Sequence, residues 1–247
     1  MEISIQSLLE GATRAKGTVA VIDVFRAFTT AATALANGAA GIVMVRSVEE
    51  ALALREAGIS QICMGEVRGR APPGFDFGNS PFEISGVDFG GKTIIQRTSA
   101  GTQGIVAAGK RADRLYAASL VTAEASVRSL LSGSPAQVSL VAMGESGLER
   151  TDEDELCAIH LRNRLEGRPG DAEAVRRLIL AGGEVGRFHD RSRPYLHPED
   201  VDIALDLDRY DFAIRIEFGS GRPVARHEGP DAEARKHKGG KQHERGG

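Results

Sequence analysis

The chain has 247 residues, of which 41% are hydrophobic, so it holds enough apolar material for one large α/β domain or two small ones. The formal net charge is −3, and composition therefore favours neither nucleic acid nor an anionic membrane as a partner. There is no Trp, and aromatic residues make up only 5% of the chain, which leaves little surface for stacking bases.

The compartment is predicted from the same features. No run approaches the ~18–20 apolar residues that cross a bilayer. The first residues lack the basic and then apolar pattern of a signal peptide. Cys63 and Cys157 lie in apolar or helical contexts, which indicates reduced thiols rather than a disulfide. We therefore expect a cytoplasmic protein.

The first hundred residues alternate strand and helix patterns. Residues 19–24 form a continuous apolar run rich in β-branched side chains, typical of a strand buried on both faces. A helix is predicted over 28–37, where Asn37-Gly38 gives a stop signal. Ser47 and Glu50 form a capping box that starts a helix ending near Ala57. Further strands are predicted at 41–45, 61–64 and 92–97.

The alternation continues through the second half of the chain. Strands are predicted at 114–118 and 137–142, and helices from after Arg97 to about Lys110, at 122–131 and at 153–165. This order predicts an α/β fold with three layers, α/β/α, around a mostly parallel sheet.

The C-terminal part gives weaker signals. Residues 169–211 are more helical and polar, and residues 212–218 alternate in the manner of an edge or half-exposed strand. From Gly229 onward almost no apolar residue occurs, so we predict a domain over 1–228 and a disordered polar tail over 229–247.

Several polar segments follow directly after predicted strands. Asp23, Glu66, residues 98–102 and the loop after Ala142 all occupy such positions. Ligands of parallel α/β sheets bind at the carboxyl ends of the strands, so we expect these segments to converge at one edge.

Residues 97–102 resemble an anion cradle. The hydroxyls of Thr98, Ser99 and Thr102, with free N–H groups around Gly101 at a helix start, suit a phosphate or sulfonate. Arg97 or Arg26 would add a charged fork. The alternative is an ordinary helix cap, which Ser and Thr provide at many helices.

Carboxylates supply the remaining candidates. Asp23 is a metal ligand, a general base, a partner of Arg26 or a helix cap, and Glu66 follows a glycine that permits close backbone approach. In the loop 74–83, Asp76 and Asn79 are flanked by glycines, whereas Ser80 and Glu83 form a capping box. The acidic run 151–155, with Glu153 and Asp154, is either a Thr-x-x-Asp helix cap or a hard-cation site.

The inventory of chemistry-bearing residues excludes several classes of site. Neither a Walker loop nor G-x-G-x-x-G occurs, no His/Cys set has metal-ligand spacing, and no Ser-His-Asp triad is evident. Carboxylates, hydroxyls, arginines and glycine loops together point to Mg²⁺-assisted chemistry on a phosphorylated small molecule.

These segments resemble the 2-phosphosulfolactate phosphatases, the ComB family. Residues 21–30, VIDVFRAFTT, match that family's IDVxRAxTT opening, and residues 65–66 with 74–81, GFDFGNSP, match its GE…GFDxGNSP signature. Residues 97–102 correspond to a Thr-rich segment ending in Gly-Thr, and Glu153-Asp154 to an ED pair opening a late helix. Many relatives have Thr-Thr-Asn-Gly-Thr where this chain has Thr98-Ser99-Ala100-Gly101-Thr102.

The resemblance implies a Mg²⁺-dependent acid phosphatase that converts 2-phosphosulfolactate to sulfolactate in the route to coenzyme M. The candidate catalytic residues are then Asp23, Glu66, Asp76 and Arg26, and the candidate Mg²⁺ ligands are Asp23, Glu66, Glu153 and Asp154. The candidate substrate-binding residues are Asn79, Arg97, Thr98, Ser99, Gly101 and Thr102. Two alternatives stay open: a phosphatase for another phosphorylated hydroxy acid, and a non-catalytic anion-binding module. A homodimer is the default assembly.

Overall fold

The computed structural model describes residues 1–219 and 221–229. Its strands are β1 (Glu2–Ser7), β2 (Gly17–Ile22), β3 (Gly41–Val45), β4 (Ile62–Gly65), β5 (Thr93–Arg97), β6 (Ala112–Ala118), β7 (Gln137–Ala142), β8 (Ala213–Gly219) and β9 (Arg222–Glu228). Its helices are α1 (Leu8–Arg14), α2 (Ala27–Ala36), α3 (Val48–Glu56), α4 (Gly101–Ala108), α5 (Ala123–Leu131), α6 (Asp152–Leu165), α7 (Ala172–Ala181) and α8 (Pro198–Ala204), with 3₁₀ turns η1 (Leu120–Thr122) and η2 (Glu184–His189).

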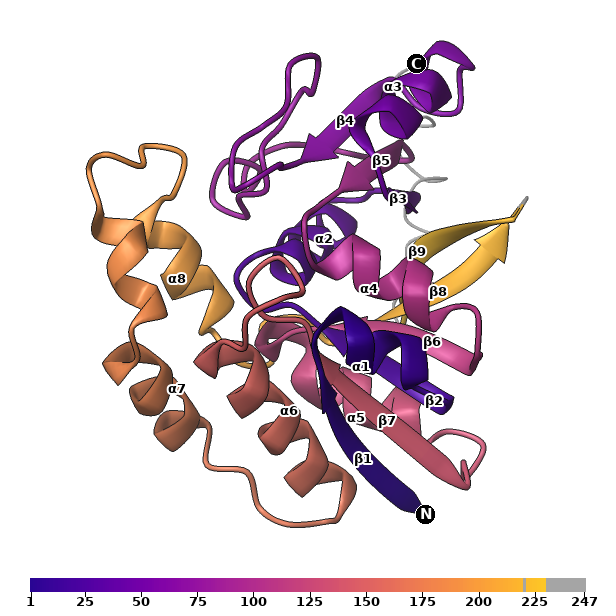
Figure 1. The fold of residues 1–247 in the computed structure, drawn as a ribbon, viewed down its shortest axis with the longest axis vertical. Coiled ribbons are helices and arrows are strands. Elements are labelled where there is room, and N and C mark those ends of the chain that lie inside the picture. Colours follow the sequence, from indigo (N-terminus) through magenta and orange to yellow (C-terminus); the bar gives the residue numbers. More distant parts are fainter. Residues whose placement is uncertain (220, 230–247) are drawn as a thin grey trace, which may run out of the picture.

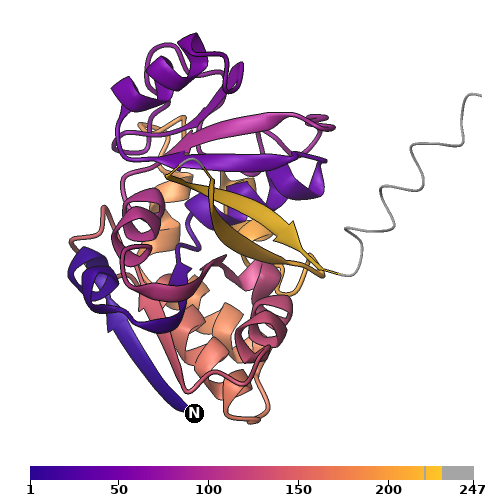
Figure 2. The same cartoon turned by 90° about the vertical axis from the view of Figure 1, so that its right-hand side faces the viewer.

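The strands described form one nine-stranded sheet in the order β1-β7-β2-β6-β8-β9-β3-β5-β4. Helices cover both faces of this sheet (Figure 1), which confirms the predicted three-layer α/β/α class. The sheet is mostly parallel: β1, β7, β2 and β6 pair parallel in one block, and β3, β5 and β4 in another. Between the blocks lies the β8–β9 hairpin, which pairs antiparallel with both (Figure 2).

The hairpin changes how the strand ends of the two blocks meet. Three successive antiparallel ladders, β6–β8, β8–β9 and β9–β3, reverse the strand direction between the blocks. In a flat sheet the two sets of carboxyl ends would lie at opposite edges. Adjacent strands rotate by about 20–25°, so the five steps from β2 to β5 accumulate roughly 100° of twist. This twist allows the carboxyl ends of β2 and β5 to face a common cavity.

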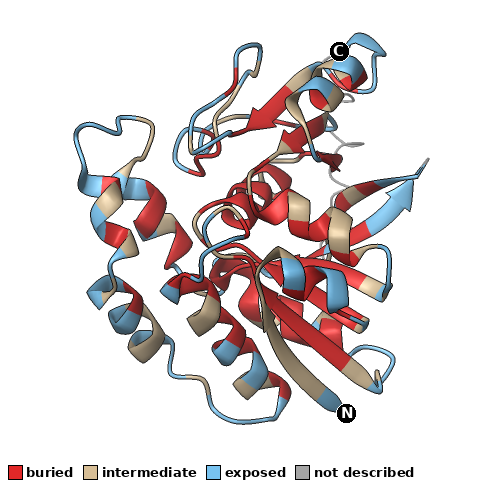
Figure 3. Cartoon of the chain, in the orientation of Figure 1, coloured by how far each residue is buried: buried red, intermediate tan, exposed pale blue. Residues whose placement is uncertain are grey.

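Successive side chains along the strands point alternately to the two helix layers. Val19 and Val21 of β2 belong to the apolar cluster that contains α1, α2 and α4, whereas Ala20 and Ile22 belong to the cluster of α5, α6 and α8. A smaller cluster joins α3 to β3, β4 and β5. Strands β2, β3 and β7 are therefore buried on both faces (Figure 3), as the continuous apolar run of β2 predicts.

The predicted elements between residues 19 and 165 are confirmed, with boundaries shifted by a few residues. Ser47 caps α3 as expected, since its Oγ accepts the Glu50 N–H at 3.1 Å. The pattern at residues 212–218 gives an alternating, half-exposed strand, β8, but its placement at an edge is wrong because β8 lies between β6 and β9. Strands β1 and β9 and helix α1 have no counterpart among the predicted elements.

Two further expectations concern the polar tail and membrane-spanning segments. All of the predicted polar tail except Gly229 lies outside them. None of the helices within 1–219 and 221–229 combines the length and the apolar character that a bilayer crossing requires.

The junction after β4 depends on a glycine. Gly65 has φ of +137°, and a Cβ there would lie 1.9 Å from the Arg97 carbonyl oxygen of neighbouring β5. A side chain would force β4 and β5 apart and displace Glu66, which follows immediately. We expect Gly65→Ala to lower the free energy of unfolding by about 3–5 kcal/mol and the Tm by about 10 °C, measured by thermal and urea denaturation.

Gly183→Ala is the matched control, because a Cβ at Gly183 meets no atom within 4 Å and its φ is not positive. Equal stability of the two variants would contradict the packing argument.

Candidate functional site

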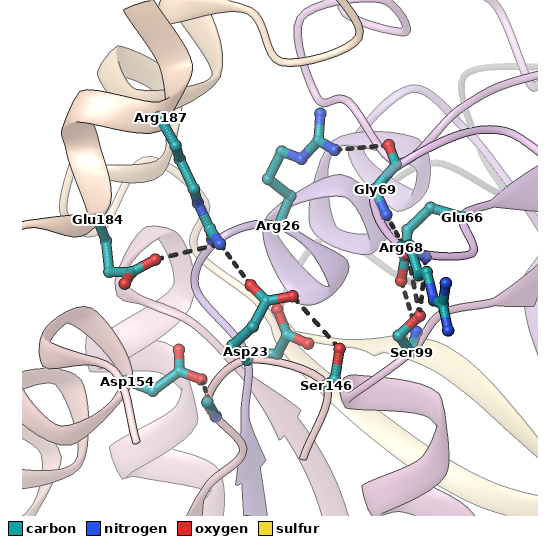
Figure 4. Close-up of polar contacts among 12 residues, drawn as sticks. Asp23, Arg26, Glu66, Arg68, Gly69, Ser99, Ser146, Asp154, Glu184 and Arg187 are labelled. Carbon is teal, nitrogen blue, oxygen red and sulfur yellow. Dashed lines mark hydrogen bonds and ion pairs between the residues drawn. The ribbon is translucent and has the colours of Figure 1, made fainter. Parts of the chain in front are cut away.

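A cavity of about 90 Å³ lies where the strand ends of both blocks meet the η2–α8 segment. Its walls come from the ends of β2, β4, β5 and β7 and from the chain around η2 and α8 (Figure 4). The lining residues are Asp23, Phe25, Arg26, Glu66, Arg68, Gly69, Asn79, Ser99, Ala100, Gly144, Glu145, Ser146, Arg187, Arg193, Tyr195 and Leu196. The predicted convergence of Asp23, Glu66, residues 98–102 and the loop after Ala142 is thus confirmed in part: all four segments reach the cavity, but only Ser99 and Ala100 of 98–102 line it, and the strand ends belong to two blocks of opposite direction.

Glu66 fastens the end of β4 to the loop after β5. Its carboxylate accepts hydrogen bonds from the Gly69 N–H at 2.7 Å, from the Ser99 hydroxyl at 3.0 Å and from the Ser99 N–H (Figure 4). Arg97 strengthens the junction by donating to the Glu66 carbonyl at 2.6 Å. Most acceptor positions of Glu66 are thus occupied by the protein itself.

Asp23 is a buried carboxyl at the end of β2. Its Oδ1 accepts the Ala27 N–H at 3.0 Å, and a Cβ on Gly101 would approach its Oδ2 to 2.9 Å. Burial raises the pKa of Asp23 from 3.8 to about 6; the charges of Glu66 and Glu145 add to the rise, while the Ala27 and Gly101 N–H groups oppose it. The pKa lies near the pH at which a general base works best.

Arg26 does not pair with Asp23, so that interpretation of the adjacent charges is wrong. Its Nη1 donates to Asp200 at 2.9 Å and to the Tyr195 carbonyl at 3.0 Å, and its Nη2 donates to the Gly69 carbonyl at 3.3 Å. A guanidinium has five N–H donors. The remaining two have no acceptor among the described residues, and Arg26 lines the cavity, so they are available to an anionic ligand.

Asn79 presents an unsatisfied amide to the cavity. The residue is 5% exposed, and its Oδ1 is buried without a hydrogen-bond partner among the described residues. Buried polar atoms are nearly always hydrogen-bonded in folded proteins. The position of Asn79 in the cavity wall therefore points to a ligand or a water molecule as its partner.

The segment 97–102 contributes less to the cavity than the sequence predicts. Only Ser99 and Ala100 of this segment line it. Thr98 and Thr102 are buried and bond each other, with the Thr98 N–H donating to the Thr102 hydroxyl at 2.8 Å and the Thr102 N–H donating to the Thr98 hydroxyl at 3.1 Å. The Thr98 hydroxyl thus accepts an N–H of the first turn of α4, although the N-cap position is Ala100 and has no side-chain capping bond; Gly101 packs beneath Asp23.

Asp76 lies outside the cavity lining. Its carboxylate accepts the Cys63 N–H at 2.8 Å and lies 3.7 Å from Arg55. It thereby tethers the loop after β4 to the strand itself. Ser80 accepts the Glu83 N–H at 3.2 Å, as its capping box predicts, although residues 81–86 form turns rather than a helix.

Glu153 and Asp154 lie beneath the cavity and do not line it. Asp154 accepts the Val24 N–H at 2.7 Å and the Gly144 N–H at 2.8 Å, and burial raises its pKa well above the usual range, with the charges of Glu153 and Asp23 adding to the rise. Burial likewise raises the pKa of Glu153 to about 7. The predicted Thr-x-x-Asp cap is wrong, because Asp154 bonds these two loop amides and Thr151 makes no capping bond.

The carboxylates of the site do not form a complete protein cage for a metal. No group of three or more His, Cys, Asp or Glu side chains within 1–219 and 221–229 is placed to hold a metal ion. Of the four predicted ligands, Asp23 and Glu66 line the cavity, and Glu145 joins them there.

The segment of the chain that carries these strand ends also matches known proteins. The family model of 2-phosphosulpholactate phosphatases matches residues 3–182. The chain belongs to this family. It is 38% identical to a probable 2-phosphosulfolactate phosphatase of Pseudothermotoga lettingae over 81% of this chain and 83% of that protein. The protein of the same name in Bacillus subtilis is 31% identical over 79% and 85%.

A third relative matches over a shorter stretch. The probable 2-phosphosulfolactate phosphatase of Deinococcus radiodurans is 40% identical over 51% of this chain and 53% of its own length. The chain thus spans about half the length of that relative.

The sequence did not single out several residues at or beside the cavity, among them Glu145, Arg187, Arg193, Tyr195 and Asp200. Glu145 lies in the loop after β7, where the strand-end rule already pointed. Arg187 donates to Glu145 and lies 3.1 Å from Glu184 (Figure 4). The other three belong to a segment without regular periodicity, so only the folded structure places them at the site.

The pKa of Asp23 gives a test of the site's electrostatics. A carboxyl whose folded pKa is raised stabilises the fold below its unfolded value of 3.8, and this contribution is lost as the pH rises through about 6. We expect Asp23→Asn, without divalent cations, to raise the free energy of unfolding by about 1–3 kcal/mol at pH 7.5 and to leave it unchanged at pH 4. Urea denaturation at both pH values measures the difference.

Asp113→Asn serves as the control, because Asp113 is an exposed residue of β6. A gain for Asp23→Asn that is the same at both pH values would contradict the electrostatic cause.

Proposed function

We propose that this protein hydrolyses the phosphate monoester of 2-phosphosulfolactate and releases sulfolactate and phosphate. One observation carries the proposal: residues from four separate strand ends of the family-matched segment line a single small polar cavity, namely Asp23, Glu66, Asn79, Ser99 and Glu145. The names of the relatives from Bacillus subtilis and Pseudothermotoga lettingae support the substrate. The physiological context, a step toward coenzyme M, is part of the proposal.

The cavity suits a substrate with several negative charges. Arg26 has unused donors, and the Arg68 guanidinium, which also lines the cavity, has no hydrogen-bond or ion-pair partner among the described residues. Arginine forks bind phosphate and carboxylate oxygens in a fixed geometry, and sulfonate oxygens offer a similar arrangement. These two arginines would hold the charged ends of the substrate, the Asn79 Nδ2–H₂ group would donate to a further anionic oxygen, and the Asn79 Oδ1 would accept from water.

Asp23 is the group best suited to handle a proton. With a pKa of about 6, it is mostly ionised at neutral pH and still basic enough to accept a proton from water. In the proposed reaction, water attacks phosphorus while Asp23 takes its proton, the ester P–O bond breaks, and the leaving alkoxide is protonated by solvent. Arg26 and Arg68 stabilise the negative charge on the phosphoryl oxygens.

The donor set is compatible with Mg²⁺. Magnesium sites commonly use one or two carboxylates with water and substrate phosphate oxygens, and do not need a full cage of protein ligands. The charges of Glu66 and Glu145 both disfavour ionised Asp23, so a cation beside Asp23 would relieve this repulsion. Glu145, rather than Glu153 or Asp154, is therefore the proposed Mg²⁺ ligand, and Asp23 beside it stays free to accept the proton. Bound there, the ion would supply charge neutralisation at the phosphoryl group.

The direct test is phosphate release from 2-phosphosulfolactate, beside a panel of other phosphorylated hydroxy acids. We expect release that is lost on chelation with EDTA and restored by Mg²⁺. Asp23→Asn should lower kcat at least about 100-fold, because it removes the base. Glu145→Gln should raise the Mg²⁺ concentration needed for half-maximal rate. No release from any ester would overturn the proposed function.

The role of Asn79 gives a second test. Asn79→Ala removes the amide without changing the charge of the site, and we expect kcat/KM to fall about 10-fold, the effect of one hydrogen bond. Asn163→Ala is the matched amide deletion, because Asn163 lies on α6 and does not line the cavity; it should leave kcat/KM unchanged. Unchanged kcat/KM in Asn79→Ala as well would show that its unpaired amide serves another purpose.

A further inference from the structure

Asp200 on α8 is the most completely buried carboxylate near the cavity. Its exposed fraction is 0%, and it accepts three hydrogen bonds. Oδ2 accepts from Arg26 at 2.9 Å, and Oδ1 accepts from the Ser80 hydroxyl at 2.6 Å and from the Phe82 N–H at 3.1 Å. One side chain thus joins the loop after β2, the loop after β4 and α8.

The ion pair between Arg26 and Asp200 is an inefficient way to stabilise a fold. Both side chains are at most 4% exposed, and the desolvation of two buried charges offsets most of their attraction. What such a pair does well is fix the direction of a guanidinium, because the charge-assisted bond has a preferred geometry. The arrangement therefore favours a role in orienting Arg26.

The two oxygens of Asp200 act on different parts of the cavity wall. Through Oδ2, Asp200 fixes Arg26, whose other bonds to Tyr195 and Gly69 leave two donors for a ligand. Through Oδ1, it fixes Ser80, the residue directly after Asn79. Arg26 and Asn79 both line the cavity, whereas Asp200 does not.

We propose that Asp200 is a positioning residue, which holds Arg26 and the Asn79–Ser80 turn in the arrangement that binds the phosphate group. The inference rests on the proposed phosphatase function. It concerns a residue beyond the segment 3–182 that the family model matches, so the binding geometry depends on a part of the chain outside that segment.

The test is a double-mutant cycle of Arg26→Gln and Asp200→Asn, the latter being nearly isosteric. For each variant we measure kcat and KM, and separately the Kd of inorganic phosphate by calorimetry. We expect Asp200→Asn to lower kcat/KM at least about 10-fold and to weaken phosphate binding. Because part of the Asp200 effect passes through Arg26, the combined loss in the double variant should be well below the product of the two single losses.

Asp202→Asn is the control, since Asp202 lies on the same helix and is exposed; it should change neither quantity. Two outcomes would overturn the inference and leave a structural role. One is a loss of kcat/KM in the double variant equal to the product of the two single losses. The other is an Asp200→Asn protein that loses thermal stability but keeps its kcat/KM and phosphate affinity. If the wild type binds phosphate but hydrolyses no ester, the proposed function fails and the phosphate cycle still decides the role of Asp200. A wild type that does neither overturns both.

Discussion

The site depends on a twisted sheet that joins two parallel blocks of opposite direction. The antiparallel β8–β9 hairpin separates these blocks and reverses the strand direction between them. Without twist, Asp23 at the end of β2 and Glu66 at the end of β4 would lie at opposite edges. Rotation accumulated across the ladders brings them to one cavity. The hairpin is therefore part of the construction of the site, although neither of its strands lines it.

Buried carboxylates then hold the loops at the strand ends in fixed positions. Asp154 bonds the amides of Val24 and Gly144, which adjoin Asp23 and Glu145 respectively. It connects the ends of β2 and β7 to the first turn of α6. Glu66 makes the corresponding connection between the loops after β4 and β5. Both bind backbone N–H groups, so each fixes a chain path and not merely a side chain. The loops are thus set before any ligand arrives, which limits the ordering entropy lost on binding.

The sequence predicts the architecture well because central strands such as β2 and β3 are buried on both faces and their apolar runs are continuous. It also predicts which loops meet. The reason it offers, a mostly parallel sheet with residues 212–218 as an edge or half-exposed strand, is incomplete, because these residues enter the middle of the sheet. Local pattern cannot show this: the alternation in β8 reflects one covered face, and an edge strand gives the same pattern.

Individual roles are harder to predict than positions. Thr98, Thr102 and Asp76 have the residue types of a binding site, yet their hydrogen-bonding groups are used within the protein. Asp200, in contrast, lies on α8, a helix whose bounds the sequence does not predict, and its importance comes from partners 118 and more positions away. Residue type and spacing report what a side chain can donate or accept. The partner that each hydrogen-bonding group meets is decided by tertiary contacts, which produce no periodic pattern in the sequence.

Charged residues around the cavity come both from the family-matched segment 3–182 and from the chain after it. The carboxylates Asp23, Glu66 and Glu145 come from strand ends within the family-matched segment, whereas Arg187 and Arg193 come from beyond it. Arg187 donates to Glu145, one of the groups whose charge raises the pKa of Asp23. Withdrawing Arg187 would leave the Glu145 charge less compensated, and Asp23 would become harder to ionise. Through Arg187 and Glu145, the segment after residue 182 therefore acts on the reactive carboxyl by charge, even though it shares none of the strand-end patterns.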